Sequence, residues 1–395
     1  MPTRNLLPLF AALSFAIGAY AASAADDDPG LRGASPILAP AELPPAKPPF
    51  KLGPMPHTTN PLLVLPMGPA PAWAPDIDPQ MLAVIEELQA SEPPTQTRLT
   101  PFQFRNAVSA AEAVDKLVKK VGQPPMPPKS DLAQGVLPAG PPEGLFVRTY
   151  TPVSGTGPFP VIVYFHGGGW VIADLRTYEA GAQALAEKAG AIVVSVAYRL
   201  APEFPFPTAH EDAFAAYRWV VANAAQLNGD PNRIATAGES AGGNLAVAVA
   251  LMARDRGVRL PRHIVSVYPI ADGDTVSPSY LRYADAQPLS KPLAEYFLDR
   301  YVPAPEQRSN ELISLMRANL AGLPPTTIIN AQIDPLASDG EELAAQLTAQ
   351  GVPVLQRTFQ GVTHEFFGMA AVLEQAADAQ NLAAKRLREA FAAAP

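Results

Sequence analysis

The stretch GESAGGNLAVAVALMARD, residues 238–255, decides the fold. It places Ser240 between a short apolar run, residues 234–237, and a helix-forming run rich in Ala, Leu and Val. The spacing of Gly238, Ser240 and Gly242 fits G-x-S-x-G, a sharp strand-to-helix turn in which small neighbours let the chain and a substrate approach a nucleophilic serine. The helix that follows directs its N-terminal amides at whatever the serine attacks. For this pentapeptide alone, a glycine-rich turn with a surface serine is the alternative.

Length, charge and composition narrow the class of protein. A chain of 395 residues with 48% hydrophobic content suits one large catalytic domain with an extension better than two equal domains. The net charge of -8, without a basic run or basic residues interleaved with aromatic ones, argues against a nucleic-acid partner. Because the chain has no cysteine, disulfides, thiolate catalysis and cysteine-based zinc sites are excluded.

The N-terminal region has the composition of an export signal followed by a leader. Residues 1–24 contain Arg4, an apolar stretch and small residues, and we expect a secretory signal peptide cleaved after Ala24, which places the protein in the periplasm or outside the cell. An uncleaved membrane anchor is the alternative, but the stretch is short and Pro8 interrupts it. No later segment is long and apolar enough to span a bilayer. Residues 25–77 are proline-rich, so we expect an extended, partly disordered leader.

The remaining chain divides into a helical segment and an alternation of strands and helices. Residues 78–130 predict an N-terminal helical cap, with helices over 78–89 and 100–122, the second opening at Thr100 and Pro101 and ending at Gly122. Residues 131–395 predict the catalytic domain. Its expected strands are 145–152, 161–167, 191–198, 233–238, 263–269, 326–333 and 352–359, and its expected helices are 178–190, 209–226, 339–351 and the one after Ser240. This pattern predicts an α/β fold with a mostly parallel central sheet covered by helices on both faces.

A nucleophilic serine needs a base, because its hydroxyl is a weak nucleophile at neutral pH. His364 follows the last expected strand, at the sheet edge where such folds bind ligands, and we predict that it is the base. The other histidines have simpler interpretations. His57 lies in the leader, and His166 braces the glycine loop. His210 lies in the first turn of a helix, and His263 opens a core strand.

The base in turn needs an acid, expected between serine and histidine in the chain and after the next-to-last strand. Asp334 directly follows the expected strand 326–333 and is our assignment. Asp339 is the obvious competitor, but helix N-capping explains it. Asp272, which follows the preceding strand, is a third choice.

The oxyanion donors are expected from the run HGGGW, residues 166–170, and from the amide of Ala241, which follows the nucleophile. Three consecutive glycines let backbone amides point into a site without a side chain in the way. A loose turn is the alternative. Trp170 is either a wall of the pocket or part of the core.

Five ordered motifs, HGGGW, YRLAPE, GESAGGNLA, DPLASDG and the loop of His364, resemble the hormone-sensitive-lipase family of α/β-hydrolases over residues 78–395. The resemblance implies the α/β-hydrolase fold and an ester hydrolase that needs no metal or organic cofactor and acts on small-molecule esters. It assigns the oxyanion donors to Gly168 and Gly169. It also implies a second cap segment, residues 275–301, over the acyl pocket.

Two positions depart from the family pattern: Ala197, where an acidic residue is common, and Glu365, where glycine is common. Glu365 either places a negative charge beside His364 and raises its pKa, or points to solvent. Neither departure removes a catalytic group. We therefore predict a serine carboxylesterase for short- to medium-chain acyl esters, acting through an acyl-enzyme. The alternatives are a non-catalytic ligand-binding protein on the same fold and a hydrolase of amide or polymer ester bonds.

Overall fold

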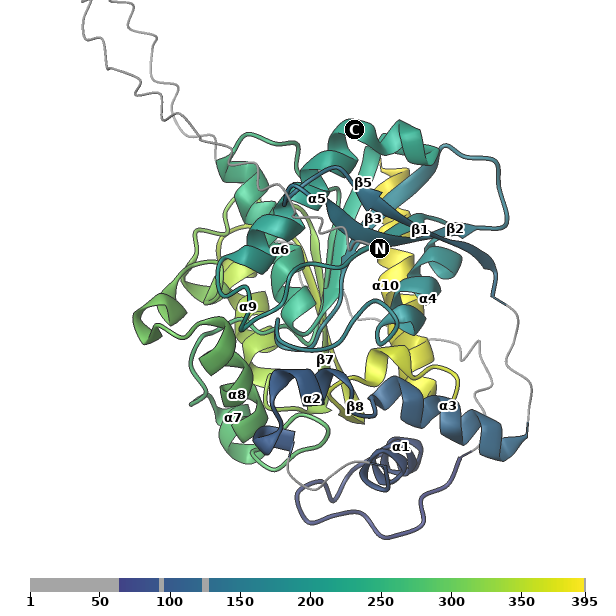
Figure 1. Cartoon of the computed structure of the whole chain (residues 1–395), viewed down its shortest axis with the longest axis vertical. Coiled ribbons are helices and arrows are strands. Elements are labelled where there is room, and N and C mark those ends of the chain that lie inside the picture. The colour runs from purple at the N-terminus through teal and green to yellow at the C-terminus, as the bar shows by residue number, and fades with distance from the viewer. Residues whose placement is uncertain (1–63, 92–95, 123–127, 394–395) are drawn as a thin grey trace, which may run out of the picture. The chain divides into compact units, whose positions relative to one another are not determined.

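A central sheet of eight strands carries the fold in the computed structural model, which describes residues 64–91, 96–122 and 128–393 (Figure 1). The strand order is β1-β2-β4-β3-β5-β6-β7-β8. Strands β3 to β8 run parallel, whereas β1 and β2 are antiparallel to their neighbours. The strands are β1 (Ser130–Leu137), β2 (Leu145–Pro152), β3 (Phe159–Phe165), β4 (Ile192–Val196), β5 (Gly229–Glu239), β6 (Ile264–Val267), β7 (Thr326–Ile333) and β8 (Val354–Thr363).

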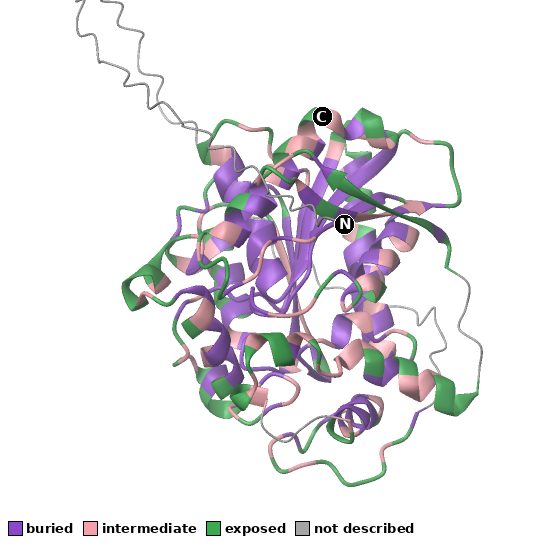
Figure 2. Ribbon diagram, in the orientation of Figure 1, coloured by how far each residue is buried: buried purple, intermediate pink, exposed green. Residues whose placement is uncertain are grey.

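The central strands are buried on both faces, which explains their continuous apolar sequences. Every residue of β3 and β4 is buried, and Figure 2 shows the buried colour running along the middle of the sheet. β1 is different: its six inner residues are exposed, and it lies at the sheet edge. That strand was not predicted, because a strand solvated on both faces has no hydrophobic alternation.

Helices cover both faces of the sheet, as the alternating pattern predicts. Helices α4 (Glu179–Ala189) and α10 (Glu374–Ala392) lie on one face, and α5 (Thr208–Asn223), α6 (Ala241–Asp255) and α9 (Ala337–Ala349) lie on the other (Figure 1). Helix α10 was not among the expected helices. Short 3-10 helices occupy Gln96–Arg98, Ala224–Leu227, Pro305–Ser309, Leu315–Arg317 and Phe366–Gly368.

The two segments predicted as the cap contain, in their described residues, five helices: α1 (Pro79–Gln89), α2 (Pro101–Arg105), α3 (Ala110–Val121), α7 (Pro278–Arg282) and α8 (Lys291–Tyr301). The single helix predicted over 100–122 is wrong, because residues 106–109 are not helical and separate two helices. Thr100 and Gly122 do begin and end the run, but Ser109 starts a second helix through a capping box with Glu112. The predicted second cap segment contains α7 and α8, and Tyr296 of α8 donates a hydrogen bond to the carbonyl of Leu99.

The end of the predicted leader, residues 64–77, is held against the domain instead of extending into solvent. Val64, Ala74 and Ile77 are buried. The Glu86 carboxylate accepts hydrogen bonds from the amide of Met67 at 2.6 Å and from the following amide at 2.7 Å. The signal peptide, the rest of the leader and His57 lie outside the described residues. Within the described ranges, no helix combines the length and hydropathy needed to cross a membrane.

Candidate active site

Ser240 occupies a sharp turn between β5 and α6, as the G-x-S-x-G spacing predicts. Its backbone has φ 58° and ψ -120°, outside the regions that L-residues favour. Glycine is required on both sides: a Cβ on Gly238 would lie 2.1 Å from the Gly242 carbonyl oxygen, and one on Gly242 would lie 2.0 Å from the Phe165 oxygen. This crowding holds the serine at the carboxyl end of the sheet.

Three side chains predicted to act together form one hydrogen-bonded line. The Ser240 hydroxyl lies 2.9 Å from His364 Nε2, and His364 Nδ1 lies 2.7 Å from Asp334 Oδ2. Asp334 directly follows β7 and His364 directly follows β8, so two neighbouring parallel strands bring acid and base together. With Nδ1–H donating to the carboxylate, Nε2 is free to accept the serine proton. All three residues are buried.

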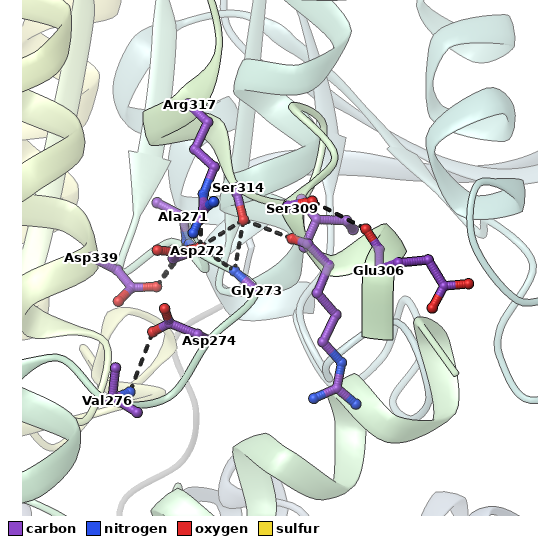
Figure 3. Close-up of polar contacts among 12 residues, drawn as sticks. Ala271, Asp272, Gly273, Asp274, Val276, Glu306, Ser309, Ser314, Arg317 and Asp339 are labelled. Carbon is purple, nitrogen blue, oxygen red and sulfur yellow. Dashed lines mark hydrogen bonds and ion pairs between the residues drawn. The ribbon is translucent and has the colours of Figure 1, made fainter. Parts of the chain in front are cut away.

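The two competing acids hold a loop next to the site. Asp339 is not an N-cap, because α9 begins two residues earlier; its Oδ2 accepts the amides of Ala271 at 2.9 Å and Asp272 at 3.2 Å. Asp272 Oδ1 accepts the Ser314 hydroxyl at 2.6 Å and the Gly273 amide at 2.7 Å (Figure 3). Both carboxylates thus fix the backbone that follows β6, and neither has a hydrogen bond to His364 among the described contacts.

The other described histidines are buried structural groups. His166 Nδ1 lies 2.8 Å from the Gly167 carbonyl, which fits the predicted brace of the glycine loop. His210 is not a simple first-turn residue, since its ring nitrogens meet the Tyr301 hydroxyl at 2.7 Å and the side-chain oxygen of Asn244 at 3.0 Å. Burial lowers the pKa of His166 and of His210 to about 4, and that of His263 to about 3.

The glycine loop lies beside the serine, and its close packing excludes larger residues. Gly168 and Gly169 line the same pocket as Ser240, with φ values of 96° and 59°. A Cβ on Gly168 would lie 2.4 Å from the Ile172 carbonyl oxygen. Ala241 is the buried first residue of α6. Trp170 belongs to the core, where its ring stacks on Tyr301 at 4.7 Å, so it is not a pocket wall.

Glu239, which immediately precedes Ser240, is a neighbour of the candidate site that the sequence did not lead us to predict. Its buried carboxyl accepts hydrogen bonds from the hydroxyls of Tyr164 and Tyr268. The Tyr268 ring in turn lies against the His364 imidazole, with centroids 4.5 Å apart. Burial raises the pKa of Glu239 to about 8, against the hydrogen bonds of the two tyrosines, which lower it. The acidic residue within the motif GESAG, residues 238–242, is the sequence feature that could have indicated this carboxyl group beside the site.

Glu365 faces the site, so of its two predicted orientations the solvent-directed one is wrong. Its carboxyl accepts a hydrogen bond from the Tyr178 hydroxyl and lines the pocket. Burial alone would lower the pKa of His364, but the charge and hydrogen bond of Asp334, with the carboxyls of Glu365 and Glu239, outweigh it. The pKa of His364 is therefore raised above its ordinary value.

The pocket over Ser240 has an empty volume of about 740 Å³, its solvent-open mouth included. Its walls come from both cap segments and from the sheet edge, and most are apolar. The main apolar side chains are Leu88, Phe104, Val108, Ile172, Ile270, Leu289, Leu293, Phe297 and Leu336. Among the described residues, no group of three or more His, Asp or Glu is arranged to hold a metal ion.

Comparison with known proteins places this geometry in a family. Residues 162–368 match the family described as having the alpha/beta hydrolase fold. The chain belongs to the α/β-hydrolase fold family. Among its relatives is the esterase LipI of Mycobacterium tuberculosis, 36% identical over 326 residues that cover 80% of this chain and 95% of LipI. The carboxylesterase NlhH of the same species is 41% identical over 249 residues, covering 62% of this chain and 78% of NlhH.

Solved structures that are similar to this chain are also those of esterases. A thermostable esterase from Pseudomonas putida superposes with a TM-score of 0.74 at 27% identity, covering 81% of this chain and 99% of its own. An esterase from Pyrobaculum calidifontis gives a TM-score of 0.70 at 33% identity, covering 80% and 100%. The predicted fold, the resemblance to the hormone-sensitive-lipase esterases and the enzyme class, a carboxylic ester hydrolase, are confirmed by these relatives.

Proposed function

We propose that this protein hydrolyses short- to medium-chain acyl esters of small molecules through a covalent acyl-enzyme on Ser240. The observation that carries the proposal is the continuous line from Asp334 through His364 to Ser240, which ends in a mostly apolar pocket. The apolar walls suit an acyl chain, and the esterase relatives support the reaction class.

In the first half-reaction, His364 Nε2 takes the hydroxyl proton of Ser240 as Oγ attacks the ester carbonyl carbon. The carbonyl oxygen becomes an oxyanion, which accepts hydrogen bonds from the amides of Gly168, Gly169 and Ala241. His364 then gives its proton to the leaving alcohol oxygen as the carbon–oxygen bond breaks. The products of this half-reaction are a free alcohol and acylated Ser240.

In the second half-reaction, water replaces the alcohol. His364 takes a proton from the water, whose oxygen attacks the acyl carbon, and returns it to Ser240 Oγ as the acid leaves. Asp334 holds the imidazole with Nδ1–H directed at its carboxylate and stabilises the imidazolium in both halves. The site residues need no co-reactant other than water.

The test is hydrolysis of p-nitrophenyl esters from acetate to palmitate by the intact protein and by Ser240→Ala. We expect the highest kcat/KM on the shorter chains and a loss of more than about 10⁴-fold in the variant. Ser309→Ala, at an exposed serine, is the matched control and keeps the activity. A folded protein that hydrolyses none of these esters contradicts the proposal and favours a ligand-binding role.

We also propose that the protein is exported, with cleavage after Ala24, because residues 1–24 have the composition of a signal peptide. Mass spectrometry of the protein recovered from the periplasm or the medium should give an N-terminus at Ala25. A full-length chain retained in the cytoplasm would contradict export.

A further inference from the structure

Glu365 has the acidic side chain of the pocket. Of the described residues that line the pocket, Glu365 alone is acidic, none is lysine or arginine, and His364 is the other titratable group besides Tyr178. The aromatic rings of Tyr178, Phe104 and Phe297 also line the pocket. A carboxylate beside aromatic and apolar walls attracts a cation, because the ring faces are electron-rich and the surroundings screen charge less than water does.

Glu365 is held in a conformation that suits glycine better. Its φ is 71°, in the left-handed region. Its side chain is fixed by the hydroxyl of Tyr178, the residue that precedes α4. Non-glycine residues in such a conformation persist where the surroundings hold them and are concentrated at functional sites. The strained backbone therefore presents a carboxyl group next to the catalytic base.

The neighbouring carboxyl groups of Asp334 and Glu239 differ from that of Glu365 in their partners and positions. Asp334 is hydrogen-bonded to His364, and Glu239 accepts hydrogen bonds from Tyr164 and Tyr268 and lines a small side cavity rather than the main pocket. Glu365 lines both the side cavity and the main pocket. The acidic group that a bound ester meets is consequently that of Glu365.

We propose that Glu365 selects substrates by charge, favouring esters with a cationic group near the scissile bond over neutral isosteres and disfavouring anionic ones. This inference rests on the proposed esterase function and names a substrate class for the same pocket. The shared chemistry is a quaternary ammonium or protonated amine, carried on either the alcohol or the acyl side of the ester.

The test compares kcat/KM for matched esters, followed by proton release at mildly alkaline pH, since burial raises the pKa of Glu365. For the alcohol side the probes are acetylcholine, its neutral isostere 3,3-dimethylbutyl acetate and the anion 4-acetoxybutanoate. For the acyl side they are ethyl 4-(trimethylammonio)butanoate and its neutral isostere ethyl 5,5-dimethylhexanoate. We expect a cation-to-neutral ratio of about ten on at least one side, with the anion poorest.

Glu365→Gln removes the charge, and Glu365→Gly restores the residue that suits the backbone, so both should bring the ratio close to one. Glu341→Gln, at an exposed position on α9, changes the net charge equally and should keep the wild-type ratio. A wild-type ratio near one on both sides, or a ratio unchanged in both Glu365 variants, overturns the inference. Failure of the proposed function looks different, because the wild type would then hydrolyse neither these esters nor p-nitrophenyl esters.

Discussion

A Gly169→Ala substitution places a methyl group against the ring of Phe297. An ideal Cβ on Gly169 lies 2.2 Å from Phe297 Cγ, whereas apolar carbon atoms rest about 3.5–4.0 Å apart. The glycine loop or the ring on α8 must therefore move by about 1 Å or more. The alanine also inherits a φ of 59°, and a left-handed backbone costs an L-residue about 1–2 kcal/mol.

Because the Gly169 amide is proposed to bind the oxyanion, this displacement should lower kcat/KM by about 10²–10³-fold, or about 3–4 kcal/mol of transition-state stabilisation. Hydrolysis of p-nitrophenyl butyrate measures the loss, and circular dichroism with a thermal melt checks the fold. Gly190→Ala is the matched control: φ is 64°, yet no described atom lies within 4 Å of its Cβ. It should lose stability but not activity.

Combining Gly169→Ala with Phe297→Ala removes the atoms that the methyl group meets. In a double-mutant cycle the pair should therefore lose less activity than the sum of the two single losses. A folded Gly169→Ala variant that keeps kcat/KM within about threefold of wild type would refute the assignment of this amide to the oxyanion.

Three further predictions concern the charged side chains. Asp334→Asn should lower kcat by about 10⁴-fold, because it favours the wrong imidazole tautomer of His364. Asp339→Asn, the same change at a buried residue that braces a loop, should keep kcat within a few-fold of wild type. Equal losses in the two variants would contradict the assignment of Asp334 as the acid. Since kcat/KM needs neutral His364, whose pKa is raised partly by Glu365, activity should fall as pH drops through that pKa. Glu365→Gln should move this acid limb to lower pH, and an unmoved pH–kcat/KM profile would contradict the coupling. Arg105→Ala removes hydrogen bonds from α2 to two backbone carbonyls of the catalytic domain; melts and kinetics should show a lower Tm and a KM that rises more than kcat falls.

The positions of Ser240, Asp334 and His364 could be predicted because each comes at or shortly after the carboxyl end of an expected strand. Parallel strands end at one edge of the sheet, so residues at those ends converge whatever the intervening loops do. The strand order decides which ends are neighbours, and β7 and β8 pair directly, which brings Asp334 to His364.

The partners of Glu239 could not be predicted in this way. Tyr164 lies on β3 and Tyr268 directly follows β6, and only the order β3-β5-β6 places both beside the residue that ends β5. The direction of Glu365 was equally inaccessible, because it depends on a left-handed backbone that hydrophobic periodicity does not report. Side-chain pairs between strands distant in sequence follow from the sheet topology, which local patterns specify only in part.

The incorrect prediction of a single helix over residues 100–122 concerns residues that line the pocket. Periodicity favoured one helix, but the run contains two capping boxes, Thr100 with Gln103 and Ser109 with Glu112, and the second one marks a new helix start. The break places Val108 and Ser109 on the wall of the pocket above Ser240. A continuous helix would have a different backbone path at these two residues. The local capping signal thus overrides the longer periodic one at residues that line the pocket, as expected when a sequence departs from its simplest pattern at a functional site.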